Sequence, residues 1–170
     1  MKRKYIKKIF SIFHRTKAYP GDIIGIAGAI GGSPTPLDKE GDFLSHCKHV
    51  HSTAILSDGL HPAIRNIMER SGVSAEIQLE NLPFGPQMMH NHGSQPSTLY
   101  QLALHDGHFH EILVAADPKQ FADLAADFQK RFGESLHAIG RIVNGDPQRV
   151  NYIENGFGAI EFAPQWEHLC

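Results

Sequence analysis

Residues 23–30 have the sequence IIGIAGAI, a short apolar run that lies between YPGD at 19–22 and GGS at 31–33. The run contains several β-branched residues and is short for a buried helix, and proline and glycine on both sides are typical of turns. We therefore predict a buried strand over residues 23–30 and examine the other segments relative to it.

Helix and strand patterns follow in a mixed order. Helices are predicted at about 43–51, from about 60 to 72 with Pro62 in the first turn, and from Asp117 to Gly133. Asp117 is the expected N-cap of the last helix, with Gln120 completing a capping box. The predicted strands cover about 53–58, 73–80, 109–116, 136–143, 150–154 and 157–162, and the predicted loops cover 33–41 and 83–96. Asn155-Gly156 predicts a tight turn and a closing hairpin.

The length and composition predict one globular domain. The chain has 170 residues, of which 41% are hydrophobic and 20% are charged, which excludes a disordered chain. No apolar run approaches the roughly 18 residues of a membrane-spanning helix, so none is predicted. The two cysteines, Cys47 and Cys170, match no disulfide framework and no zinc motif. The expected location is therefore the cytoplasm.

The charge is distributed unevenly. Residues 1–17 hold seven of the 16 basic residues and no acid, which leaves nine basic and 18 acidic residues in the rest of the chain. The acidic remainder argues against a general nucleic-acid binder. We therefore divide the chain into a basic arm, residues 1–17, and a domain, residues 18–170.

The arm has the pattern of a short amphipathic helix. Ile6, Ile9, Phe10 and Phe13 share one helical face, and the interruption at Ser11 argues against a secretory signal. Such a helix can lie on an anionic membrane or a partner, or it can pack on this domain or on a missing neighbour.

The 12 histidines suggest a metal hypothesis. His108 and His110 would point to the same side of a strand, as would His90 and His92 if that segment is extended. The next residue, Glu111, would point to the opposite side, so the pattern of a cupin-like site is not met. The alternative is that these histidines are polar residues on the surface or in a polar cleft.

Two other segments have alternative interpretations. The glycines of residues 25–32 resemble a phosphate-binding loop but lack the Lys-Ser/Thr of a P-loop, so close backbone packing is the alternative. Asp58 is expected where a strand ends and a helix begins, where a carboxylate can hold magnesium while the helix N-terminus faces a phosphate. The alternative for Asp58 is a helix cap.

Five motifs in order resemble the C-terminal half of the thiamine-monophosphate kinase family, within the aminoimidazole-ribonucleotide synthetase-like superfamily. PGDIIGIAGAIGGS at 20–33 matches the family's Pro-Gly-Asp, apolar strand and Gly-Gly-Ser. The family's second motif, Asp-x-Ser-Asp-Gly-Leu followed by a helix and SGVGAEI, is matched by ILSDGL at 55–60 and SGVSAEI at 71–77. DGHFHEILVA at 106–115 resembles GGEDYELLFT, and the family's IGRVT and GYDHF resemble IGRIV at 139–143 and QWEHL at 165–169.

The resemblance implies an α+β domain with a mixed or antiparallel sheet and packed helices, which in the full enzyme closes over an N-terminal domain. It further implies ATP and Mg²⁺ as cofactors, with Ser57 near the nucleotide and Asp58 on magnesium. Thiamine monophosphate is the implied substrate, and Trp166 would stack on its cationic ring. The resemblance also implies that His108 binds the substrate.

Some acids of the family pattern are replaced in this chain. Ile55 stands for the first aspartate of the metal motif, and His108-Phe109 stand for Glu-Asp. Magnesium prefers oxygen ligands, which neither Ile55 nor His108 supplies. We therefore expect a partly degenerate, stand-alone relative of the substrate-side domain that is inactive alone as a kinase.

Four other readings are open. The chain can be half of a split kinase whose partner carries the N-terminal domain, or it can form a homodimer. It can instead be a histidine-based metal-binding protein, or an interaction module that works through its basic arm.

Overall fold

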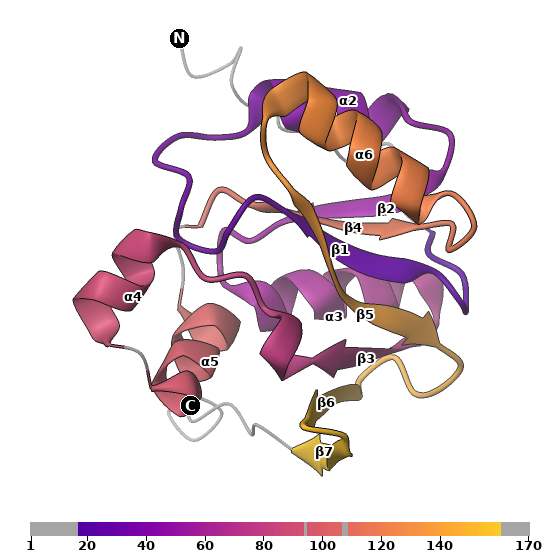
Figure 1. The fold of residues 1–170 in the computed structure, drawn as a ribbon. Coiled ribbons are helices and arrows are strands. Elements are labelled where there is room, and N and C mark those ends of the chain that lie inside the picture. The colour runs from indigo at the N-terminus through magenta and orange to yellow at the C-terminus, as the bar shows by residue number, and fades with distance from the viewer. Residues whose placement is uncertain (1–16, 94, 107–108, 161–170) are drawn as a thin grey trace, which may run out of the picture.

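A seven-stranded sheet forms the centre of the computed structural model, which describes residues 17–93, 95–106 and 109–160 (Figure 1). The strand order is β2-β4-β1-β5-β3-β6-β7. Every named pair is antiparallel except β3 with β6, so the sheet is mixed. The predicted α+β class is confirmed. The strands are β1 (Ile23–Ala27), β2 (Val50–Ile55), β3 (Ser74–Gln78), β4 (Ile112–Ala116), β5 (Leu136–Val143), β6 (Val150–Glu154) and β7 (Phe157–Ile160).

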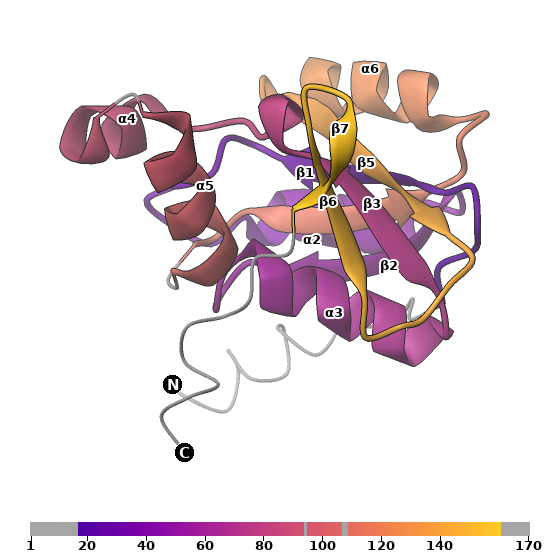
Figure 2. The ribbon, with the colours of Figure 1, turned by 90° about the horizontal axis from the view of Figure 1, so that it is seen from below.

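Helices cover both faces of the sheet. α2 (Asp38–His46) and α6 (Phe121–Phe132) lie together on one face, and α3 (Leu60–Ser71) lies on the other (Figures 1 and 2). α5 (Pro96–His105) packs beside α3, and α4 (Pro86–His92) packs beside α5. A single 3₁₀ turn, η1 (Leu79–Asn81), follows β3.

Strand β1 is buried between these two helical layers. Ile24 and Ile26 belong to the core on the α3 side, whereas Ala27 belongs to the core on the α2 and α6 side. A Cβ at Gly25 would lie 2.9 Å from the Phe121 ring, so the glycine allows α6 to pack closely on the sheet. The predicted buried strand is thus confirmed for residues 23–27, whereas residues 28–30 lie beyond its end.

Several other predicted elements are confirmed. β5 and β6 have the predicted bounds, and α3 ends at Gly72, which is left-handed at φ 66°. Asn155 and Gly156 have positive φ values of 50° and 73° and connect β6 to β7. α6 ends at Gly133 as predicted, with φ 70°.

The predicted loop over residues 83–96 is wrong, because it contains α4 and the start of α5. α4 has one buried side chain, Met88, and therefore lacks the repeated apolar positions that indicate a helix. The helix predicted over 43–51 is displaced, since α2 spans Asp38–His46 and His51 already belongs to β2.

The capping box predicted for α6 is also wrong. The helix begins at Phe121, and its N-cap residue, Gln120, makes no side-chain capping bond. Asp117 Oδ1 instead accepts a hydrogen bond from the Lys119 amide at 2.9 Å, inside the preceding turn. The pattern therefore correctly indicated a local side-chain to backbone bond but placed the helix one turn too early.

No helix among the described residues is long and apolar enough to cross a membrane. All of the predicted basic arm except Lys17 lies outside the described residues, and the boundary at 17/18 stays a prediction.

A polar cluster connects α3, α5 and β6 on the α3 side of the sheet. His61 Nδ1 and the Tyr152 hydroxyl form a hydrogen bond of 2.6 Å, and the His61 and His105 ring centroids are 5.6 Å apart. Burial, together with the charges of His105 and Arg65, lowers the pKa of His61 to about 4. Burial also lowers the pKa of His105 and raises that of Tyr152. His61 is therefore neutral at pH 7.

Gly140→Ala should destabilise the sheet. A Cβ at Gly140 would overlap the carbonyl oxygen of Glu76 on β3, the strand paired with β5. We expect a loss of about 1–3 kcal/mol in the free energy of unfolding, measured by urea titration. Gly72→Asn, at a left-handed position with open space around it, is the matched control and should cost about 1 kcal/mol or less. Equal losses in the two variants would contradict the packing argument.

Acidification should destabilise the protein through His61. Because its folded-state pKa of about 4 lies below the ordinary 6.5, the unfolded chain binds the proton more readily. The contribution of His61 to the free energy of unfolding is fully present above pH 6.5 and is lost as the pH falls toward 4. His61→Gln should therefore show a shallower loss of stability over this interval, measured by urea titration at stepped pH. Parallel curves for the two proteins would refute this assignment.

Candidate functional site

One edge of the sheet brings together the chain segments that carry the sequence motifs. β1 and β2 end there and β4 begins there, as the antiparallel pairing of Ala27 and of Ile55 with Ile112 shows. The Leu56 amide donates a hydrogen bond of 3.1 Å to the Glu111 carbonyl, which extends the β2–β4 pairing to the following turn. The motifs at 20–33, 55–60 and 106–115 thus meet at this edge.

Ser57 and Asp58 form an exposed polar turn between β2 and α3. Both side chains are exposed, whereas Leu56 before them and Leu60 after them are buried. The Ser57 hydroxyl donates a hydrogen bond to Asp58 Oδ2 at 3.1 Å. The buried neighbours fix the turn while its two oxygen-bearing side chains remain accessible from solvent.

Gly59 allows the end of α5 to pack against this turn. Its φ is 97°, and a Cβ there would lie 2.7 Å from the Leu104 carbonyl oxygen and 2.8 Å from that of Asp106. Only glycine fits both the backbone conformation and the space. The contact brings the backbone of Asp106, an exposed acid that sequence reasoning did not select, against Gly59, the residue after Asp58. The signal was present, since Asp106 begins the motif that ends at 115.

The N-terminus of α3 has no side-chain cap. Its N-cap residue is Gly59, and the first turn holds no acidic residue. The alternative of Asp58 as a plain helix cap is therefore wrong, because Asp58 precedes the cap position and its side chain accepts a hydrogen bond from the Ser57 hydroxyl. The free amides of a helix N-terminus favour an anion, so this end of α3 can face a phosphate next to the Asp58 carboxylate.

Oxygen donors are what the turn offers to a metal. The Ser57 hydroxyl and the Asp58 carboxylate are oxygen ligands of the type that Mg²⁺ binds. Because Mg²⁺ keeps several waters, it needs few protein ligands. Within the described residues, however, no group of three or more His, Cys, Asp or Glu side chains could hold a metal ion. The turn thus fits one side of a magnesium site but does not complete one.

A cavity of about 320 Å³ lies next to the same edge. It is bounded by Gly31 and Ser33 after β1, by α4 residues including His92, and by Phe109 and His110 before β4. The Ser33 amide donates a hydrogen bond of 3.0 Å to Glu111 Oε1, and the Glu111 side chain is fully buried. The carboxylate therefore fixes the loop that forms one wall of the cavity.

The glycines of residues 25–32 pack closely, as the alternative interpretation proposes. Gly25 faces Phe121, and a Cβ at Gly32 would lie 2.8 Å from the Ala29 carbonyl oxygen. The backbone of Gly85 packs on Gly32 in turn, where an added Cβ would lie 2.8 Å from the Gly32 amide nitrogen. These contacts account for Gly25 and Gly32, and the positive φ values of Gly28 (85°) and Gly31 (71°) account for the other two, without a phosphate.

The remaining predicted residues divide into two groups. His108 and Trp166 lie outside the described residues. Ile55 is the last residue of β2 and pairs with Ile112, so an apolar side chain occupies the place of the family's first metal-binding aspartate. His90 and His92 lie on α4, where residues two apart do not share a face, so their convergence on an extended segment is wrong.

The comparisons with known proteins agree with the motifs. No family model matches the chain. A thiamine-monophosphate kinase of Rhodopirellula baltica is 26% identical over 136 residues, which cover 76% of this chain and 42% of that protein. The crystal structure of thiamine-monophosphate kinase from Stenotrophomonas maltophilia superposes with a TM-score of 0.70 and 22% identity, covering 85% of this chain and 54% of that one.

A second solved structure, AaThiL complexed with AMPPCP and TMP, has a TM-score of 0.60 and 20% identity, and covers 85% of this chain and 52% of that one. The chain therefore spans about half the length of the proteins that it matches, which agrees with a resemblance to one domain of two. In sequence the chain is therefore similar to a thiamine-monophosphate kinase, and its fold is that of part of the solved thiamine-monophosphate kinase structures.

Proposed function

We propose that this chain is the substrate-side part of a thiamine-monophosphate kinase-like protein, which binds a phosphorylated ligand with Mg²⁺ but does not transfer phosphate by itself. The observation that carries this proposal is the exposed Ser57-Asp58 turn at the uncapped N-terminus of α3. Hydroxyl, carboxylate and free helix amides are the groups that bind a phosphate and its magnesium ion.

Each group in the turn has a distinct role in this proposal. Asp58 holds Mg²⁺, which when bound neutralises phosphate charge, and Ser57 orients the Asp58 carboxylate and approaches the nucleotide. Gly59 lets the backbone of Asp106 pack against the turn, and the Asp106 carboxylate is proposed as a second acid for the metal. His61 is neutral at pH 7 and adds no charge to this end of α3.

The ligands that we propose are those of the similar solved proteins. One fold relative was solved with AMPPCP and TMP, so thiamine monophosphate and ATP are the first ligands to test. Trp166 is proposed to stack on the thiamine ring, and His108 to lie on the substrate side. Both follow from the family motifs.

The inactivity of this chain alone is part of the proposal and rests on replaced acids. Ile55 and His108 replace acids of the family pattern, and the chain spans 42% of its kinase homologue. Because phosphoryl transfer depends on positioning and on metal ions that neutralise charge, the residues of this chain alone are not expected to catalyse it. A protein that carries the N-terminal domain of such kinases, or a second copy of this chain, is the proposed partner. A cytoplasmic location is likewise a proposal.

Thiamine monophosphate should bind more tightly with Mg²⁺ than without it. In titration calorimetry, Asp58→Asn should remove this magnesium-dependent gain, which we expect to be about tenfold, or about 1.4 kcal/mol. Asp123→Asn, which changes an exposed aspartate on α6, is the matched control and should bind as the unchanged protein does. Trp166→Ala should weaken binding about 3- to 30-fold with or without Mg²⁺, since stacking needs no metal. Equal affinity with and without Mg²⁺ would refute the role of Asp58.

The purified chain should show no ATP turnover that depends on thiamine monophosphate. Addition of a protein that carries the N-terminal kinase domain should restore turnover if the chain is half of a split enzyme, and Asp58→Asn should prevent this. A coupled assay of ADP release measures both effects. Turnover by the chain alone that disappears in Asp58→Asn would overturn the proposed inactivity and leave the proposed binding site intact.

A further inference from the structure

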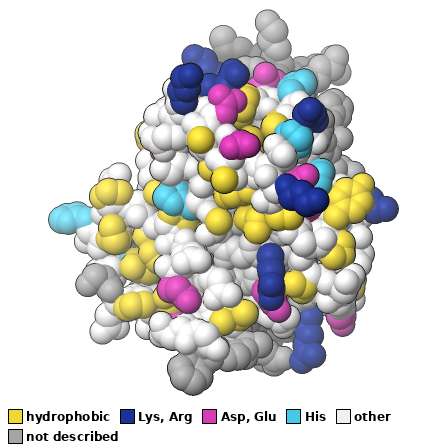
Figure 3. Space-filling model, turned by 45° about the vertical axis from the view of Figure 1, so that its right-hand side comes forward, with side chains coloured by type: hydrophobic (Ala, Val, Ile, Leu, Met, Phe, Trp, Pro, Cys, Tyr) yellow, Lys and Arg dark blue, Asp and Glu magenta, His cyan; other side chains and the backbone are white. Residues whose placement is uncertain are grey.

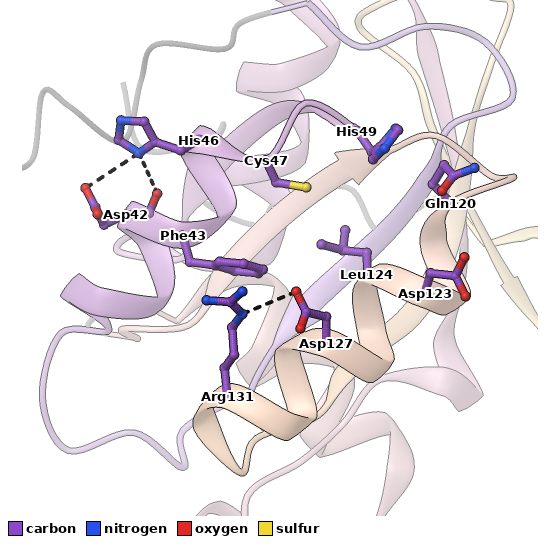
Figure 4. A pocket seen from close by; sticks show the side chains of 10 residues that line it. All are labelled: Asp42, Phe43, His46, Cys47, His49, Gln120, Asp123, Leu124, Asp127 and Arg131. Atoms are coloured by element: carbon purple, nitrogen blue, oxygen red, sulfur yellow. Dashed lines mark hydrogen bonds and ion pairs between the residues drawn. The ribbon is translucent and has the colours of Figure 1, made fainter.

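A groove lies on the face of the sheet that α2 and α6 cover, and the proposed function does not use it. It lies between α2 and α6 and has a volume of about 490 Å³ (Figure 4). Phe43 and Leu124 contribute apolar side chains from the two helices, and the Cys47 sulfur points into the space between them. Such an apolar lining, open to solvent, is a suitable surface for apolar side chains of a partner segment.

The rim of this groove is acidic. Asp42, Asp123 and Asp127 line it, and Arg131 is its one lysine or arginine among the described residues. Arg131 is already paired with Asp127 at 3.2 Å and lies over the Phe43 ring at 4.9 Å. Asp123 makes no hydrogen bond or ion pair within the described part of the chain. Figure 3 shows charged and histidine side chains intermixed over this upper part of the molecule.

We propose that the groove between α2 and α6 binds the chain's own basic arm, residues 1–16. The arm contains no acid and has six basic residues, which complement the acidic rim. On a helix, Ile6, Ile9, Phe10 and Phe13 would form one apolar face that fits the lining of the groove. The pairing would cover two apolar surfaces at once.

The arm begins close enough to reach this groove. The described part of the chain starts at Lys17, and the Ala18 amide is held by the Ser71 hydroxyl at 2.8 Å. The Tyr19 ring lies 5.1 Å from the His51 ring on β2, the edge strand, and His49 at the start of this strand lines the groove. Ser71 ends α3 on the other face of the sheet, so the arm has to pass around the edge strand β2, and a helix of 16 residues, about 24 Å long, can span this distance.

The charge of the groove favours this occupant over a lipid surface. An anionic membrane would be repelled by the rim acids, whereas a lysine-rich segment is attracted to them. The rest of the chain carries an excess of acids, so contact between this groove and the same groove of a second copy would place like charges together.

Cysteine cross-linking tests the proposal, because Cys47 is a native reporter in the groove. In a Cys170→Ser background, a short bis-maleimide should link Cys47 to Phe13→Cys within one chain, detected by peptide mass. Ser11→Cys, on the polar side of the predicted helix, is the matched control, and its yield should be about tenfold lower. Equal yields for the two positions would overturn the proposal.

Charge reversal provides a second test. Asp42→Lys combined with Asp123→Lys should lower the Phe13→Cys yield several-fold, as should about 1 M salt through screening. Glu80→Lys, an exposed acid on η1, is the control and should leave the yield unchanged. Circular dichroism checks that each variant is folded.

Three results would refute the proposal. Links found only between chains would assign the groove to a second copy, and unchanged yields in the double variant would remove the electrostatic argument. The third is the absence of a link together with liposome binding that requires residues 1–16, which would assign the arm to a membrane. Asp58 follows the end of β2, whereas the groove lies at α2, α6 and the start of β2. Ligand binding and arm docking can therefore fail independently.

Discussion

The burial of strand β1 on both faces is the constraint on which the rest of the structure depends. A strand in the middle of a sheet needs a helical layer on each side, and here α6 approaches one face through the contact between Phe121 and Gly25. The other face packs against the core that includes α3 and α5. Removal of either layer would expose a row of apolar side chains to water, which is why the two layers stabilise each other.

This arrangement also creates the candidate site. With β1 in the centre, the ends of β1 and β2 and the beginning of β4 lie at one edge, where buried residues such as Leu56 anchor exposed ones such as Asp58. The rigid sheet thus presents a short polar turn and the N-terminus of α3 together. The kinase homology gives this turn its proposed ligand, and the geometry gives each side chain its proposed role.

Much of the site could be predicted because its signals are local. The Ser57-Asp58-Gly59 turn follows a strand pattern and precedes a helix with Pro62 in its first turn, so the sequence predicts its position. Asp106 could not be placed in this way. Its backbone packs against Gly59 at the end of α5, a contact between segments more than forty residues apart that no local pattern indicates.

The sequence by itself determined the strand and helix periods, the glycine stops at Gly72 and Gly133, the uneven charge and the motifs of the kinase family, because each depends on residues that are neighbours along the chain. Only the tertiary structure decided the strand order, the helical state of residues 86–92, the neutral His61 and the acidic groove between α2 and α6. These features arise from burial and from contacts between distant segments. Such contacts form only when the core has formed, so no local pattern in the sequence indicates them.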